Sequence, residues 1–177
     1  MGPCRNQPIN GNARRAAGFL VGMNSTINET IETLNGLTEI LKDGEQGYRT
    51  AAKDVKAPEL ALVFERYATQ RSHFASTLQA HVNNLGAKVE KSGTIAGDIH
   101  RGWINLKAAL SSNEPHAVLV EAERGEEVAV AAFETAIKHR DIDQPTRVLL
   151  NSQHGEIKAA RDNVRALRDS SKYAKAV

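Results

Sequence analysis

The chain has 177 residues, enough for one domain with a hydrophobic core and too few for two comfortable ones. Its 23 basic and 21 acidic residues leave a formal net charge of +2, so the charge favours neither nucleic acid nor an acidic membrane surface as a partner. The single cysteine, Cys4, excludes a disulfide framework and a cysteine metal cage and fits a reducing cytoplasm. No apolar run approaches the ~20 residues that a membrane-spanning helix needs.

The first elements are a tail and a long helix. Residues 1–24 are rich in Gly, Asn, Arg and Pro without periodicity, which predicts a flexible tail, and Met23 is an alternative start of translation. The first long helix is expected from Ser25 or Thr26, where Thr26 and Glu29 have capping-box spacing. It must end by residue 57, because Pro58 follows.

Four further helices follow along the chain. The second begins on Pro58 and ends at Gly86, which is a natural left-handed stop. No window shows sustained period-two alternation, so no strand is predicted. The remaining elements are expected to be a shorter helix over residues 94–110, long helices over 113–139 and 143–168, and a C-terminal tail over 171–177.

The order of these elements predicts an all-α fold. Short connections at Pro58 and at residues 141–145 make two antiparallel helical hairpins, and the segment that carries Trp103 crosses over between them. The hairpins also resemble each other, since Gly44-Glu45 is echoed by Gly125-Glu126. We therefore expect a ferritin-like antiparallel four-helix bundle over residues 25–170.

Each long helix carries one polar residue on the row of residues that should be purely apolar. Burying a carboxylate costs several kcal/mol unless a partner, a proton or a metal neutralises it, so this coincidence calls for an explanation. The predicted buried polar layer consists of Glu45, Gln70, Glu126 and Gln153.

One explanation is a metal site. Ferritin-like dimetal proteins use a Glu on each of two helices and a Glu-x-x-His on each of the other two. In this chain glutamine replaces the paired-motif glutamate at Gln70 and Gln153, and too few carboxylates remain for two divalent ions. A single iron or manganese ion is the version left open, and its candidate ligands are Glu45, His73, Glu126 and Glu156.

The other explanation is a hydrogen-bonded layer without an ion. Each glutamine can donate to one carboxylate and accept from a protonated one, so two Glu and two Gln can close a satisfied ring. Such a layer would fix the register of the helices. Tyr48 and Tyr67 lie on core rows beside it and are expected to donate their hydroxyl groups.

Other polar residues suggest structure rather than chemistry. His100 and Trp103 are expected to anchor the crossover segment to the bundle. Glu123 and Glu127 are expected on a solvated charged face. We find no nucleophile elbow, phosphate loop or Cys/His ligand cluster, so no catalytic or cofactor-binding residue is assigned.

Five separated motifs over about residues 30–170 carry a family resemblance. They are Leu41 to Thr50, Gln70-Arg71 with Phe74, His100 to Trp103, Glu123 to Glu126, and Arg165 to Asp169. In this order they resemble a bacterial family of ferritin-like four-helix-bundle proteins of unknown function. The resemblance implies a ferritin-like bundle in a bacterial cytoplasm, similar to stress-associated bundle proteins, with no established activity.

Two hypotheses about function remain. The first is a non-catalytic accessory or interaction protein in stress physiology, without a cofactor and with a structural polar layer. The second is a carboxylate metalloprotein that binds iron or manganese and has oxidase, peroxidase or ferroxidase-like activity. On either reading a homodimer or another protein partner is expected, with no nucleic acid and no membrane.

Overall fold

The structure is a computed structural model that describes residues 11–87, 103, 105–112 and 114–174, with the backbone alone for residues 11–25. In this part of the chain the elements are all helical. They are α1 (Gly11–Asp54), α2 (Pro58–Asn84), α4 (Leu106–Ser111), α5 (Pro115–Lys138) and α6 (Gln144–Asp169). The prediction of an all-α chain is confirmed for the described residues.

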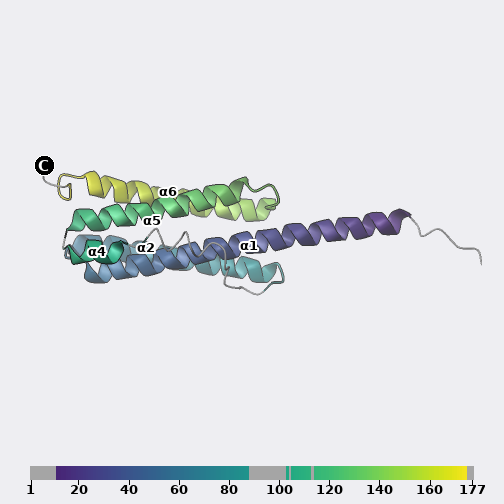
Figure 1. Cartoon of the computed structure of the whole chain (residues 1–177), viewed down its shortest axis with the longest axis horizontal. Helices are drawn as coiled ribbons and strands as arrows, with labels where there is room; N and C mark the ends of the chain where they lie inside the picture. Colours follow the sequence, from purple (N-terminus) through teal and green to yellow (C-terminus); the bar gives the residue numbers. More distant parts are fainter. Residues whose placement is uncertain (1–10, 88–102, 104, 113, 175–177) are drawn as a thin grey trace, which may run out of the picture.

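The four long helices form two hairpins that pack side by side. A short turn joins α1 to α2, and another joins α5 to α6, so each pair is antiparallel (Figure 1). Helices α2 and α5 run in the same direction, which requires a connection that returns along the bundle before α5 begins (Figure 1). This is the predicted antiparallel bundle with a long crossover.

The crossover is only partly described. Its expected helix over residues 94–110 appears as the short α4, from Leu106 to Ser111. Residues 94–102, including His100, lie outside the described residues.

The start of α1 differs from the expectation. The helix begins at Gly11, so the prediction of an irregular tail is wrong for residues 11–24, and Thr26 and Glu29 lie inside the helix rather than at its cap. The physical reason lies in the local composition, because Ala13, Arg14, Arg15, Ala16 and Ala17 are strong helix formers that continue the helix.

Local chemistry sets the other helix ends. Gly86 has φ +83°, and Gly86 and Ala87 donate to the carbonyls of Asn83 and Val82, so α2 closes with a Schellman motif at the predicted glycine. Asp143 caps α6 by accepting from the Thr146 backbone N–H at 2.9 Å. Arg147 donates to three carbonyl groups at the end of α5, those of Ile137, His139 and Ile142.

The C-terminal segment extends the bundle beyond its expected limit at residue 170. Tyr173 is 8% exposed and belongs to an apolar cluster of the core. Its hydroxyl donates to Glu59, and Lys172 pairs with the same carboxylate at 2.6 Å. These bonds hold the pKa of Glu59 at about 2, with the hydrogen bond from Lys172 as the largest cause. The predicted tail therefore docks on the start of α2.

Buried residues recur at alternating spacings of three and four along each long helix, as in a coiled coil. We call these positions the seam. They are Leu34, Leu37, Leu41, Gly44, Tyr48 and Ala51 on α1; Leu60, Phe64, Tyr67, Arg71, Phe74 and Leu78 on α2; Leu119, Ala122, Glu126, Ala129, Phe133 and Ala136 on α5; and Thr146, Leu150, Gln153, Ile157, Ala160 and Val164 on α6.

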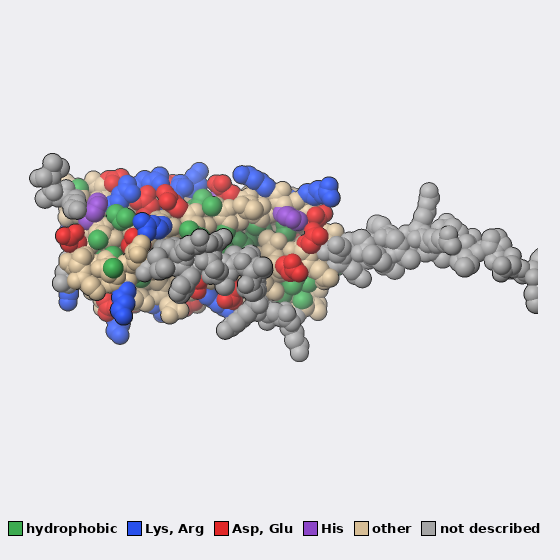
Figure 2. All heavy atoms as spheres, viewed as in Figure 1, with side chains coloured by type: hydrophobic (Ala, Val, Ile, Leu, Met, Phe, Trp, Pro, Cys, Tyr) green, Lys and Arg blue, Asp and Glu red, His purple; other side chains and the backbone are tan. Residues whose placement is uncertain are grey.

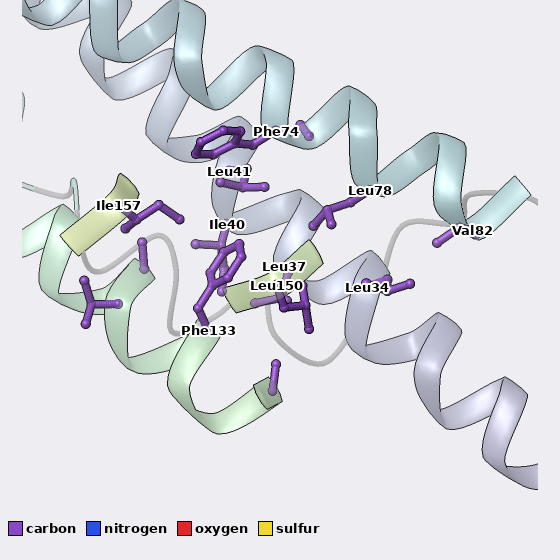
Figure 3. Packing of buried hydrophobic residues seen from close by; sticks show 14 of the residues in the cluster. Leu34, Leu37, Ile40, Leu41, Phe74, Leu78, Val82, Phe133, Leu150 and Ile157 are labelled. Carbon is purple, nitrogen blue, oxygen red and sulfur yellow. The ribbon is translucent and has the colours of Figure 1, made fainter. Parts of the chain in front are cut away.

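The seam makes two apolar clusters. One joins Leu34 and Leu41 of α1 to Leu78, Phe133 and Leu150 (Figure 3). The other joins residues such as Tyr48, Phe64, Leu119 and Val164 toward the opposite end. The polar residues Arg71, Glu126 and Gln153 are buried but belong to neither cluster.

Trp103 fits into a notch that two glycines make. A Cβ atom on Gly125 would lie 2.5 Å from ring carbon Cε2 of Trp103, and one on Gly47 would come at least as close to the same ring. The indole also meets the Tyr48 ring edge-on, with centroids 5.0 Å apart. Only a residue without a side chain at positions 47 and 125 leaves room for this packing.

We predict that Gly47→Ala or Gly125→Ala displaces the indole and destabilises the bundle by about 1–3 kcal/mol, because the added methyl overpacks the notch. The matched control is Gly155→Ala, where an added Cβ meets nothing within 4 Å and a helical alanine should stabilise by about 0.5–1 kcal/mol. Urea unfolding with the fluorescence of Trp103 measures both effects. Equal stability of Gly47→Ala and Gly155→Ala would contradict the notch.

Candidate functional site

The predicted polar layer is only half buried. Glu126 and Gln153 lie in the core with 1% and 3% exposure. Gln70 is half-buried and donates to the exposed Glu156 at 3.1 Å. Glu45 has a side chain that is 23% exposed and pairs with Arg49 one turn along the same helix at 2.8 Å.

The expectation that Glu45 occupies the core row is wrong, and its neighbour explains why. The seam of α1 runs from Leu41 through Gly44 to Tyr48, which leaves Glu45 at the edge. The aliphatic stem of Arg71 packs over Gly44, where an added Cβ would lie 3.6 Å from Cγ of Arg71, an ordinary van der Waals distance. A small residue in the seam of α1 therefore lies against a long side chain from α2.

The buried charge opposite Glu126 is Arg71, which sequence reasoning did not select. Arg71 is 1% exposed, and its Nη2 donates to both carboxylate oxygens of Glu126, at 2.6 and 2.5 Å. Its Nη1 donates to Oε1 of Gln70 at 2.6 Å. On α2 the seam passes through Tyr67, Arg71 and Phe74, so Arg71 takes the core position that was expected for Gln70.

Tyr48 completes this group. Its hydroxyl donates to Oε1 of Glu126 at 2.6 Å, and its side chain is fully buried. Burial raises the pKa of Tyr48 well above its usual value, and the neighbouring charge of Glu126 adds to the rise. We call Tyr48, Arg71 and Glu126 the core triad. It takes one residue from each of α1, α2 and α5, and so ties the two hairpins together.

The geometry of the core triad meets the conditions for burying charge. A buried carboxylate needs an opposite charge and hydrogen bonds to its remaining lone pairs, and Glu126 receives three short bonds from two side chains. The positive charge of Arg71 is likewise shared with Gln70. A tyrosine that donates to the layer was predicted, and Tyr48 does so.

Gln153 and Tyr67 take different partners from those expected. Gln153 Nε2 donates to the backbone carbonyl of Phe74 at 3.4 Å, and its Oε1 is buried without a hydrogen-bond partner. The Tyr67 hydroxyl accepts from Asn163 at 2.9 Å. The expected ring of two glutamates and two glutamines is therefore replaced by an arginine–glutamate pair.

The four candidate metal ligands do not converge. His73 and Glu156 are exposed, Glu45 is engaged with Arg49, and Glu126 is bound by Arg71. Within the described residues, a group of ligand atoms that all lie within 4.8 Å of one another is made instead by Glu29, His139 and Asp141, near the turn between α5 and α6. That group is largely exposed and lies away from the core triad.

The space beside the core triad is small. A cavity of about 10 Å³ is lined by residues that include Arg71, Glu126, Trp103 and Gly125. This volume is close to the minimum for one water molecule, far below the ~300 Å³ at which small-molecule pockets begin. This cavity therefore offers no room for an organic substrate.

A second charged group lies between α5 and α6. Glu123 is 5% exposed and accepts from Arg165 at 2.7 Å and from Arg168, so its expected place on a solvated face is wrong. Glu127 is exposed and receives a weaker contact from Arg165 at 3.2 Å. Two of the motifs that carry the family resemblance therefore meet here in space.

These observations define the class: an antiparallel helical bundle whose core carries a buried, fully partnered ion pair. The family follows from the sequence comparison. The profile of the family described as Domain of unknown function (DUF2383) matches residues 29–139, and the chain belongs to this family. The match includes all three residues of the core triad. No curated protein matches the chain.

We predict that Arg71→Met destabilises the bundle by about 3–5 kcal/mol, because it leaves the Glu126 charge buried without a partner. The triple variant Tyr48→Phe, Arg71→Met, Glu126→Leu should cost far less than this single change, since it removes every member of the group together. Urea unfolding checks both, with Glu45→Gln as the exposed control that costs less than about 1 kcal/mol. A cost for Arg71→Met as small as the control would contradict a buried pair.

We predict that Tyr48→Phe costs about 1.5–3 kcal/mol near pH 7, the value of a hydrogen bond to a charged group. Because the folded pKa of Tyr48 is raised, its stabilising contribution is complete below pH ~10 and is lost as pH rises toward the folded pKa. The difference in stability between the wild type and Tyr48→Phe should therefore shrink above pH 10. Unfolding curves at stepped pH test this, and a constant difference would be inconsistent with a buried Tyr48 hydroxyl.

Proposed function

We propose that this protein is a non-catalytic helical bundle that acts as an accessory or interaction protein. The observation that carries the proposal is the state of Glu126, whose two oxygens are both occupied by Arg71 while Tyr48 also donates to it. Three of the roughly four lone-pair positions of this carboxylate accept hydrogen bonds, which leaves it poorly placed to bind a metal or a substrate. The resemblance to stress-associated bundles supports a role in bacterial stress physiology and a cytoplasmic location.

The alternative, an iron or manganese carboxylate protein, needs a different donor set. A divalent ion beside Glu126 would lie next to the guanidinium of Arg71, which keeps its positive charge under all ordinary conditions. Removing Arg71 from Glu126 would in turn leave a buried cation unpaired. The residues of the core triad therefore do not fit a cation.

The core triad has a structural role that fits a bundle protein. Arg71 lies on α2 and Glu126 on α5, so the pair fixes how one hairpin slides along the other. A slip by one heptad would place both charges against apolar residues, at a cost of several kcal/mol. A buried pair of this kind is a means of selecting one register of packing.

The described surface also suits a protein that binds proteins. Figure 2 shows acidic and basic side chains interspersed over the face it presents, without a broad patch of one sign. No helix among the described residues is long and apolar enough to cross a membrane. The mixed charges on this face do not favour nucleic acid, in keeping with the small net charge.

The test is elemental analysis of the full chain after anaerobic loading with iron(II) or manganese(II) and exhaustive desalting. We predict less than one ion for every ten chains, a value that Glu126→Ala and Glu45→Ala leave unchanged. One or two ions per chain, lost in Glu126→Ala, would overturn the proposal. Metal that is lost in His139→Ala but kept in Glu126→Ala would instead identify a surface ion at Glu29, His139 and Asp141, and would leave the proposal standing.

A further inference from the structure

Helix α1 is much longer than its partners. It has 44 residues against 27, 24 and 26 in α2, α5 and α6. Its N-terminal part runs alone past the end of the bundle (Figure 1). Among the side chains of α1 that are described, which begin at residue 26, the first buried one is Thr30, which also meets the carbonyl of Asp141 at the turn between α5 and α6. The part before it, residues 11–29, is called the overhang.

The seam of α1 does not stop where the bundle ends. Counting back from Leu34 by alternating four and three, the seam positions of the overhang are apolar without exception. They are Ala13, Ala16, Leu20, Met23 and Ile27, with Thr30 between Ile27 and Leu34. The same heptad that buries α1 in its own bundle thus continues over about 28 Å of helix, at 1.5 Å per residue.

Most helical stability in proteins comes from packing an amphipathic face, and the overhang lacks such packing within the described part of the chain. Gly18 and Gly22 weaken it further, because glycine is a poor helix former. An apolar seam in register with the core needs a second helix to cover it. Within the described residues, no other helix of the chain extends along the overhang (Figure 1).

We propose that the overhang pairs with the overhang of a second copy of this chain, in an antiparallel two-helix coiled coil. In this register Leu20 stands level with Met23 of the partner subunit, and Ile27 stands level with Ala16 of the partner subunit. The central layers thus combine two large residues, and the outer layers combine a large residue with a small one. Because the pairing is two-fold symmetric, it closes at a dimer.

The charges beside the seam select the antiparallel orientation. Arg14 and Arg15 lie at the outer end of the overhang, which contains no acidic residue before Glu29. Glu29 and Glu32 are exposed at the inner end. Antiparallel pairing brings the arginines of one copy toward the glutamates of the other, whereas parallel pairing would bring like charges together. The two bundles then lie at opposite ends of the dimer.

This inference names a partner for the proposed interaction role but depends on the overhang alone. Light scattering of the full chain over a dilution series should give twice the mass of one chain. Leu20→Asp should halve that mass and leave the urea unfolding of the bundle unchanged, because it lies outside the bundle. The matched control is Leu62→Asp, at a leucine of α2 that is 74% exposed, which should remain dimeric.

Cysteine pairing tests the orientation. In a Cys4→Ala background, a mixture of Leu20→Cys and Met23→Cys chains should form a disulfide-linked pair at least several times faster than either variant alone. Faster pairing of Leu20→Cys with itself would mean a parallel dimer and would overturn the antiparallel arrangement.

Two further results would overturn the inference while leaving the proposed function intact. One is a wild-type chain that is monomeric at every concentration. The other is a monomer that binds anionic phosphatidylserine vesicles through the overhang, with binding lost in Leu20→Asp, which would make the segment a membrane-surface helix. The elemental analysis above tests the proposed function separately.

Discussion

The arginine–glutamate pair at the centre of the bundle is the constraint on which the rest of the core depends. Arg71 and Glu126 can stay charged in the interior only if each keeps its partner. This condition fixes the height of α2 relative to α5, and Tyr48 extends it to α1. The stem of Arg71 in turn packs over Gly44 of α1. A local polar contact thereby fixes how the helices around it are aligned.

The architecture could be predicted from the sequence because its signals are local and repeated. Proline at Pro58 and the glycine stop at Gly86 mark the helix ends, and the apolar periodicity marks the faces. The polar layer was harder to predict. An apolar row drawn through Leu41 can continue through residue 44 or residue 45, and a row drawn through Tyr67 can continue through residue 70 or residue 71. One continuation places Glu45 and Gln70 in the core, whereas strict alternation of three and four selects Gly44 and Arg71. That spacing was the missed signal.

Arginine is rarely found in a core position, so the spacing alone does not predict that Arg71 is buried. Its burial depends on an acceptor 55 residues away in the chain, on another helix, so no single helix carries this information. Trp103 illustrates the same limit. Its expected association with the bundle requires Gly47 and Gly125, two glycines on different helices whose purpose appears only when the indole lies between them.

The sequence similarity between the two hairpins does not correspond to their similarity in space. In sequence, Gly44-Glu45 matches Gly125-Glu126, yet in space the counterpart of Gly125-Glu126 is Gly47-Tyr48. Both Gly47 and Gly125 contact Trp103, and the residues that follow them share a hydrogen bond. The shift by three residues replaces a second carboxylate with a phenol at the centre of the core. Two facing carboxylates would need a cation or a proton between them. A tyrosine, a glutamate and one arginine instead balance their charges and hydrogen bonds among themselves.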